Sequence, residues 1–344
     1  MKASNSAALL AGNNLRLQPT ALRDESGLTR GGAGTSLTIG NNLSLQAGND
    51  LQLHGVAIAA GGDAALQAGH DLSLTPVTDA NGKATVRTSI ATGGSLQLAA
   101  GNDLTIRQAQ VKADGNLIAA AGHDLNVTSV LGDSRTVTDQ TRQGKTRVVT
   151  TTTTQDIDQQ ALTAGGNLVL SAGHDVNLTA AKLDAGTGLA VVAGNDLNST
   201  TLTTVDSSTT LETCKRFKQT TSTRDETVHG SEFTAGGDIA LQSGHDVNLT
   251  AANLFTDKGA LAVSAGNDVN LLTAQEQHDA VQDMQKKKKG FLSSKTTTTH
   301  DEWHDSTAVA TTLSGDTVQD AGIRRGDPHH HGGPSAQDRM RDGR

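Results

Sequence analysis

Residues 165–179 read Gly165-Gly166-Asn167-Leu168-Val169-Leu170-Ser171-Ala172-Gly173-His174-Asp175-Val176-Asn177-Leu178-Thr179. Leucine or valine recurs at every second position in each half of this stretch, at Leu168 and Leu170 and then at Val176 and Leu178. A period of two residues is typical of β-strands, in which successive side chains point to opposite faces. The stretch therefore predicts two short strands joined by a Gly-His-Asp corner.

The same corner recurs along the chain. It reads Ala-Gly, then Asn or His, then Asp, then Leu or Val, and the one variant has Ser243 in place of Ala. Its glycines are predicted to lie in structural turns, and they are Gly48, Gly69, Gly101, Gly122, Gly173, Gly194, Gly244 and Gly266. Successive glycines are 21, 32, 21, 51, 21, 50 and 22 residues apart. Such repetition is typical of solenoids, so a 21-residue unit is interrupted at alternate steps.

Three short strands in each unit predict an all-β fold, a right-handed parallel β-helix with rungs of about 21 residues. The chain has 4 Phe, 1 Trp and no Tyr, so small aliphatic side chains must fill its core. The residues after each corner should form one inward ladder, made of Leu51, Leu72, Leu104, Leu125, Val176, Leu197, Val247 and Val269. Five aromatic residues in 344 argue against a conventional compact enzyme.

The corner position after glycine alternates between Asn (49, 102, 195, 267) and His (70, 123, 174, 245). Both residues tolerate positive φ, which predicts a backbone role in the turn. The Asp that follows is expected to bind backbone N–H groups across the turn. Calcium binding by stacked aspartates is the alternative, although the Gly-Gly-x-Gly-x-Asp nonapeptide does not occur. We expect no metal site, no catalytic residue and no cofactor.

Four insertions interrupt the repeats, near residues 75–85, 130–160, 199–234 and 275–312, the last being rich in Lys and Thr. All follow the same strand of a rung, so they should leave one edge of the prism as β-hairpins lying side by side. Asn81-Gly82 is a strong hairpin signal, and the other turns are expected near Gln143-Gly144, Cys214–Lys218 and Lys286–Phe291. Residues 1–39 are interpreted as degenerate coils, 40–274 as the repeats and 313–322 as the start of a further rung.

Basic residues gather at the expected hairpin tips although the net charge is 28 − 36 = −8. Lipid head groups or lipopolysaccharide phosphates are the predicted partners, and solubilisation of the hairpins is the alternative. An acidic chain is not expected to bind nucleic acid. The tip residues are Arg142, Lys145, Arg147, Lys215, Arg216, Phe217, Lys218, Lys286, Lys287, Lys288, Lys289 and Phe291.

The ends of the chain differ from the repeats. No signal peptide or membrane-spanning apolar run is present in the sequence, and the single Cys214 excludes an intrachain disulfide. After Gly322 the expected Asn/His-Asp becomes Ile323-Arg324, which suggests a reading-frame break near residue 320. Residues 323–344 are predicted to be disordered, and the triplets Arg325-Gly326-Asp327 and His329-His330-His331 are interpreted as chance matches to integrin-binding and metal-binding motifs.

The Ala-Gly-Asn/His-Asp-Leu repeats, with Lys286–Phe291, His300–Glu302 and Asp305–Val309, resemble the haemagglutinin repeats of filamentous haemagglutinin-like exoproteins. The resemblance covers roughly residues 11–318. These proteins are secreted by two-partner systems of Gram-negative bacteria and include contact-dependent growth inhibition proteins. The resemblance implies a secreted or surface-located parent and an outer-membrane transporter as its partner. The family's amino-terminal secretion domain and C-terminal toxin domain are absent from this sequence.

Three functions remain open at this stage. The first is the shaft of a surface adhesin that displays its side hairpins to a host or neighbouring cell. The second is a segment of a contact-dependent growth inhibition protein that assists toxin delivery. The third, a carbohydrate-active β-helix enzyme, is disfavoured because the repeated acids lie at corners and aromatic sugar platforms are nearly absent. We expect that the chain is not an enzyme.

Overall fold

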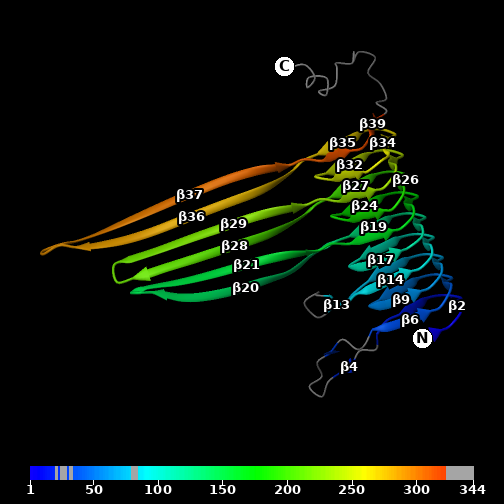
Figure 1. Cartoon of the computed structure of the whole chain (residues 1–344), viewed down its shortest axis with the longest axis horizontal. Helices are drawn as coiled ribbons and strands as arrows, with labels where there is room; N and C mark the ends of the chain where they lie inside the picture. The colour runs from blue at the N-terminus through cyan, green and yellow to red at the C-terminus, as the bar shows by residue number, and fades with distance from the viewer. Residues whose placement is uncertain (20–21, 24–28, 31–33, 79–83, 323–344) are drawn as a thin grey trace, which may run out of the picture.

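The computed structural model describes residues 1–19, 22–23, 29–30, 34–78 and 84–322. Within these ranges every helix or strand element is a β-strand. The strands form three long parallel sheets, one six-stranded antiparallel sheet and two short two-stranded sheets (Figure 1). The all-β, right-handed parallel β-helix predicted from the repeats is confirmed.

The three parallel sheets are here called sheets A, B and C, and each coil of the shaft contributes one strand to each. Sheet A contains β1 (Lys2–Ala3), β6 (Thr35–Ile39), β9 (Val56–Ala60), β14 (Thr88–Thr92), β17 (Ala109–Ala113), β22 (Ala161–Ala164), β25 (Lys182–Ala185), β30 (Glu232–Ala235), β33 (Asn253–Thr256) and β38 (Thr312–Ser314). Sheet B contains β2 (Ala7–Ala11), β7 (Leu43–Ala47), β10 (Ala64–Ala68), β15 (Leu96–Ala100), β18 (Leu117–Ala121), β23 (Leu168–Ala172), β26 (Leu189–Ala193), β31 (Ile239–Ser243), β34 (Ala260–Ala265) and β39 (Thr317–Gly322). Sheet C contains β3 (Leu15–Leu17), β8 (Leu51–His54), β11 (Leu72–Thr75), β16 (Leu104–Arg107), β19 (Leu125–Thr128), β24 (Val176–Thr179), β27 (Leu197–Thr200), β32 (Val247–Thr250) and β35 (Val269–Leu272).

The predicted inward ladder is confirmed by the register of sheet C. Leu72 pairs with Leu51 on one side and Leu104 on the other, and Leu125 pairs with Val176. These side chains are fully buried. Val269, in the last strand of the sheet, is only partly buried because no coil covers it in sheet C. Each deeply buried rung removes an aliphatic side chain from water, which stabilises the shaft by about 1.5–3 kcal/mol per residue.

The outer face of sheet C carries a polar ladder of stacked asparagines. The amide of each donates to the side-chain oxygen of the asparagine one coil earlier, at distances of 2.9–3.1 Å. Its members are Asn126, Asn177, Asn198, Asn248 and Asn270. The period of two therefore separates an aliphatic inner face from a hydrogen-bonded outer face.

Every insertion leaves the shaft at the corner between sheets C and A. The antiparallel pairs are β4 (Leu22–Arg23) with β5 (Thr29–Arg30), β12 (Val77–Thr78) with β13 (Ala84–Val86), β20 (Val130–Gln143) with β21 (Thr146–Asp158), β28 (Leu202–Cys214) with β29 (Phe217–His229), and β36 (Ala274–Lys289) with β37 (Ser294–Val309). They follow β3, β11, β19, β27 and β35, which are alternate strands of sheet C.

The earliest insertion was not predicted. Residues 1–17 form a coil in register with the next one, since Leu15 pairs with Leu51, and β4 and β5 lie between this coil and β6. The corner there reads Gly12-Asn13-Asn14, with Asn in place of Asp, so the repeat spacing does not reveal the insertion. The interpretation of residues 1–39 as degenerate coils therefore needs correction.

The three long hairpins pair with one another to form the side sheet, a single sheet in the order β20-β21-β28-β29-β36-β37 (Figure 1). Hairpins two coils apart are offset by about 9.6 Å, because successive coils are separated by ~4.8 Å. A hairpin is two strands wide, which is also about 9.6 Å. One hairpin on every second coil thus gives the spacing at which neighbouring hairpins share hydrogen bonds, as β21 with β28 and β29 with β36.

Buried hydroxyl groups anchor the roots of the hairpins. Ser129, at the root of the hairpin formed by β20 and β21, donates to the carbonyl of Ala180 at 2.7 Å and accepts from the N–H of Gln160 at 2.7 Å. Thr88 donates to Thr75 O at 2.7 Å beside the shorter hairpin formed by β12 and β13. These contacts tie the hairpin to the corner of the adjacent coil, so the side sheet is oriented by the shaft.

At its far end the shaft stops within the described residues at β39. Gly322 pairs with Ala265, one position before the corner glycine Gly266, so it does not continue the glycine ladder. The predicted turn Asn81-Gly82, the Arg325-Gly326-Asp327 and His329–His331 triplets and the predicted disorder of 323–344 lie outside the described residues. Among the described residues no helix is long and apolar enough to cross a membrane.

Candidate interaction surfaces

The corner glycines allow successive coils to stack closely. A Cβ atom on Gly122 would overlap the carbonyl oxygen of Gly101, and a Cβ on Gly173 would overlap that of Gly122. The same holds for the other corner glycines, each against the glycine one coil earlier: Gly48, Gly69, Gly101, Gly194, Gly244 and Gly266. Their role is therefore to permit close approach between coils. The described glycines with positive φ are Gly55 and Gly144, which lie elsewhere.

The prediction that the Asn and His residues after these glycines adopt positive φ is wrong. Among the described residues other than glycine, positive φ occurs at Gln108, Ala180 and Ala251, which lie at the corner between sheets C and A. What Asn and His share is an N–H donor at the same place in the side chain. Asn195 Nδ2 donates to Asp175 Oδ1 at 2.9 Å, and His245 Nδ1 lies 2.9 Å from Asp196 Oδ1.

The corner aspartates bind backbone N–H groups of the next coil, whereas a contact within the turn was expected. Asp124 Oδ1 accepts from the N–H of Asp175 at 3.1 Å, and Asp175 Oδ1 accepts from the N–H of Asp196 at 3.0 Å. Partial burial alone would raise the pKa of Asp124, but the Asp175 N–H and the His174 ring hydrogen-bond to the carboxylate and hold its pKa below the usual value.

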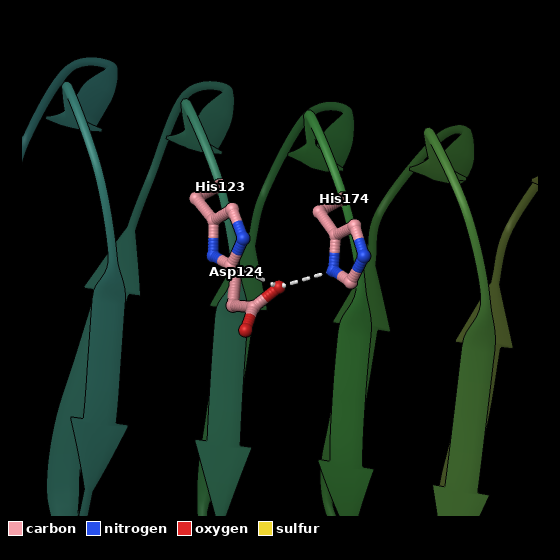
Figure 2. Close-up of side chains that lie close together, drawn as sticks. All are labelled: His123, Asp124 and His174. Carbon is pink, nitrogen blue, oxygen red and sulfur yellow. Dashed lines mark hydrogen bonds and ion pairs between the residues drawn. The ribbon is translucent and has the colours of Figure 1, made fainter.

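His123 and His174 lie side by side at this corner, on consecutive coils (Figure 2). Their rings stack with centroids 4.7 Å apart and an interplanar angle of 1°. Both Nδ1 atoms face Asp124 Oδ1, at 3.4 Å from His123 and 3.0 Å from His174. Hydrogen bonding to Asp124 raises the pKa of His174 above its ordinary value. The sequence prediction placed these histidines in a turn and did not bring the two rings together.

The predicted tip residues of the three long hairpins come together at the outer end of the side sheet. Arg147 pairs with Thr213 across two hairpins, Phe217 pairs with Lys286, and the N–H of Lys287 donates to Arg216 O at 2.8 Å. We call this region the cationic end. It comprises Arg142, Lys145, Arg147, Lys215, Arg216, Lys218, Lys286, Lys287, Lys288, Lys289 and Lys295.

Two details of the tips differ from the prediction. Lys286–Lys289 form the last part of β36, and the turn occupies residues 290–293. Phe291 and Leu292 in that turn are fully exposed, whereas Phe217 is partly buried at the start of β29. The turn of the first long hairpin is Gly144-Lys145, one residue later than expected. Leu292 was overlooked because it follows Phe291 outside the basic run.

A second group of titratable residues lies nearer the shaft, on one face of β36 and β37. His300 Nδ1 is 2.6 Å from Asp283 Oδ1 and its Nε2 is 2.7 Å from Glu302 Oε1. His304 Nδ1 is 2.7 Å from Asp279 Oδ1. These carboxylates raise the pKa of both histidines, and the histidines lower the pKa of Glu302. The alternating spacing 300, 302, 304 could have revealed this group.

Comparison with known proteins agrees with this architecture. Residues 29–78, 75–145, 139–215 and 213–321 match the hemagglutinin repeat. The chain is similar to a protein of Dickeya dadantii (strain 3937) named Deoxyribonuclease CdiA, with 41% identity over 140 residues. That match covers 39% of this chain and 4% of the relative, so the chain spans a small part of the relative's length. No solved structure is significantly similar to the chain.

Proposed function

The chain belongs to the hemagglutinin repeat family of filamentous haemagglutinin-like exoproteins, and on this premise we propose that it is a stretch of an adhesin shaft whose side sheet contacts a cell surface. Members of this family are secreted and exposed at the bacterial surface. The outer-membrane transporter of the two-partner system is the proposed partner during export of the parent protein. The family is structural, and no enzymatic activity is indicated for this segment.

The separation of the cationic end from the shaft is the observation that carries this proposal. Segments 140–149, 213–219 and 284–299 contain 3 + 3 + 5 = 11 Lys and Arg residues and no Asp or Glu, in a chain of net charge −8. The strands that carry them are 13 to 16 residues long, which corresponds to roughly 44–54 Å of reach. A side sheet of this reach presents its positive charge well away from the acidic remainder.

Phosphate groups of an anionic membrane surface fit this end. Each Lys or Arg near such a surface contributes about 1 kcal/mol of attraction. Phe291 and Leu292 stand fully exposed beside Lys286–Lys289, so apolar side chains accompany the cations. The alternative is that the lysines only keep the exposed strand edges soluble and block pairing between sheet edges.

Binding to vesicles tests the proposal. The chain should sediment with vesicles that contain anionic lipid or lipopolysaccharide and remain free of vesicles of neutral lipid. Binding should weaken with added salt, because the screening length shortens to ~8 Å near physiological ionic strength. Replacement of Lys286–Lys289 and Phe291 by Ser should abolish most of the binding.

A matched control removes basic residues from the shaft instead. Lys112, Lys182 and Lys258 are exposed shaft lysines, and their joint replacement by Ser should leave vesicle binding unchanged. Equal binding by wild type and the Lys286–Phe291 variant, or no binding by either at low salt, would overturn the surface-contact proposal and leave solubilisation as the role of the cationic end.

Toxin delivery is the second candidate, and the similarity to the protein named Deoxyribonuclease CdiA favours it. In that case the same shaft would assist the transfer of a C-terminal toxin into a neighbouring cell. The complete gene discriminates the two candidates, because a nuclease or other toxin domain encoded downstream supports delivery and an uninterrupted series of repeats supports the adhesin.

A further inference from the structure

We propose that His123, Asp124 and His174 form a binding site for a first-row divalent transition-metal ion, with Zn²⁺ as the probe that tests it. The two imidazoles come from the corners between β18 and β19 and between β23 and β24, which the fold brings to consecutive coils (Figure 2). The potential ligand atoms of the three residues all lie within 4.8 Å of one another.

The donor set is that of a transition-metal site. Imidazole nitrogen is the commonest protein ligand for such ions, and two imidazoles with one carboxylate suit zinc, iron, copper or nickel. Calcium and magnesium prefer oxygen ligands alone. Both rings are about half exposed, 53% for His123 and 47% for His174, so an ion can enter and the remaining coordination positions are open to water.

Small side-chain rotations bring the three donors to bonding distance. An ion about 2.1 Å from each nitrogen and oxygen in a tetrahedral arrangement needs the donors ~3.4 Å apart. Asp124 Oδ1 already lies at 3.4 Å and 3.0 Å from the two nitrogens. The exposed rings must therefore approach one another by about 1 Å, while the backbone ladder of the corner stays in place. The ion then replaces the Nδ1 protons that now point at the carboxylate.

Neighbouring aspartates create a negative potential at this place on the shaft. Asp103 Oδ1 lies 3.2 Å from His123 Nδ1, and Asp175 Oδ1 lies 3.4 Å from His174 Nδ1. Three carboxylates from three consecutive coils thus surround two neutral rings. Such an arrangement attracts a divalent cation more strongly than either ring would attract a proton alone.

The repeat itself supplies the comparison sites. His70 is flanked on adjacent coils by Asn49 and Asn102, and His245 by Asn195 and Asn267. Each of these corners offers one imidazole with its aspartates, whereas the corner of His123 and His174 is the one among the described residues where two imidazoles are adjacent. The site is therefore a local departure from the alternation of His and Asn.

Asparagine is a conservative replacement at this position. Asn102, Asn195 and Asn267 donate through Nδ2 to the aspartate of the preceding coil at 2.8–2.9 Å, which is the contact that the His Nδ1 makes. The double variant His123→Asn/His174→Asn should keep the corner hydrogen bonds and the far-ultraviolet circular dichroism spectrum, and it removes both nitrogen ligands.

Isothermal titration with Zn²⁺ is the test. The full chain is used with His329, His330 and His331 replaced by Ala, because three consecutive histidines bind metals on their own. We expect one zinc ion per chain, and zinc affinity at least about tenfold weaker in the double Asn variant. The variant His245→Asn should bind as the background does, since it removes a histidine that has no imidazole neighbour.

Two further outcomes decide the proposal. If the double Asn variant binds Zn²⁺ as tightly as the background, or if the background binds none, the corner is a hydrogen-bonded ladder and the metal site is refuted. The variant His300→Gln/His304→Gln covers the other group of histidines on the side sheet, and loss of the zinc signal in that variant alone would likewise overturn the assignment to His123 and His174.

Discussion

Arg142 on β20 lies directly opposite Arg147 on β21. Like charges that face each other across two strands destabilise a hairpin, and Lys288 and Lys295 repeat the arrangement in the outer hairpin. The side sheet therefore keeps repulsive pairs at its outer end, although β-strand register would allow an acidic residue at either position. An anionic partner that neutralises both members of each pair would account for this.

The variant Arg142→Glu tests that interpretation. It converts the repulsive pair into an attractive one, so the hairpin formed by β20 and β21 should exchange its amide hydrogens more slowly. Binding to anionic vesicles should fall by more than about fivefold, since the change removes one cation and adds one anion. Lys258→Glu, an exposed shaft position, is the matched control and should leave binding unchanged. Unaltered vesicle binding in Arg142→Glu would contradict the role of this pair.

The aliphatic ladder should tolerate no charge. An aspartate at Leu125 or Val176 would lie unpaired between buried neighbours, and such burial costs several kcal/mol. We expect cooperative loss of the β signal in circular dichroism for Leu125→Asp and Val176→Asp. Ile118→Asp changes an exposed position of β18 and should keep the wild-type spectrum. Unchanged spectra in the two core variants would refute the stacked ladder.

The corner glycines can be tested with a single methyl group. In Gly122→Ala the new Cβ would overlap Gly101 O, so the coils must separate and the free energy of unfolding should fall by about 1–3 kcal/mol. Gly12→Ala is the control, because nothing lies within 4 Å of a Cβ there. Chemical denaturation measures both. Equal stability of the two variants would show that coil stacking does not require glycine.

The outer hairpin should respond to pH through His300 and His304. Their pKa values are raised by Asp283, Glu302 and Asp279, so their stabilising contribution is fully present below the unfolded-state pKa and is lost as pH rises through the raised values. Glu302 has a lowered pKa, so its contribution is lost only as pH falls through that value. Amide exchange in β37 should therefore be slowest at mildly acidic pH.

Two controls accompany the pH experiment. The variant His300→Gln/His304→Gln should flatten the pH dependence of amide protection in β37. Protection in β21, which carries no histidine, should follow only the intrinsic pH dependence of exchange. Greater protection of β37 at alkaline than at mildly acidic pH would contradict the sign of the pKa shifts.

Calcium should not stabilise the shaft. The oxygen atoms of the corner aspartates already accept backbone N–H groups and Asn or His donors of adjacent coils, as Asp71 does from Asp103 and Asn102. We expect equal melting temperatures in EGTA and in excess calcium. A calcium-dependent rise of several degrees would instead assign the corners to ion binding.

The strands of the shaft are predictable because their determinants are local in sequence. Alternation at Leu168 and Leu170 defines a strand, and the 21-residue spacing aligns each strand with its equivalent one coil later. The hairpin turn beside Lys215 and Arg216 is predictable for the same reason. By contrast, the pairing of β21 with β28 depends on the distance between alternate coils, which no single stretch of sequence contains.

The chemistry of the corner also exceeds what the sequence reveals. Asn and His at one position have two common properties, tolerance of positive φ and an N–H donor, and only the observed backbone dihedrals and contacts distinguish them. The adjacency of His123 and His174 follows from an insertion of 30 residues between consecutive coils, since 174 − 123 = 51 and the unit is 21. Residues separated in this way look unrelated until the coils are stacked.

The alternation of hairpin-bearing and plain coils has a consequence for inheritance. The sheet C strands that precede the long hairpins begin at Leu125, Leu197 and Val269, and both intervals are 72 residues, since 197 − 125 = 269 − 197 = 72. Recombination between such units would add or delete one whole module and leave the remaining hairpins in phase. Deletion of one plain coil would crowd two hairpins into the width of a single strand, about 4.8 Å. A shaft of this kind therefore lengthens and shortens across generations by even numbers of coils.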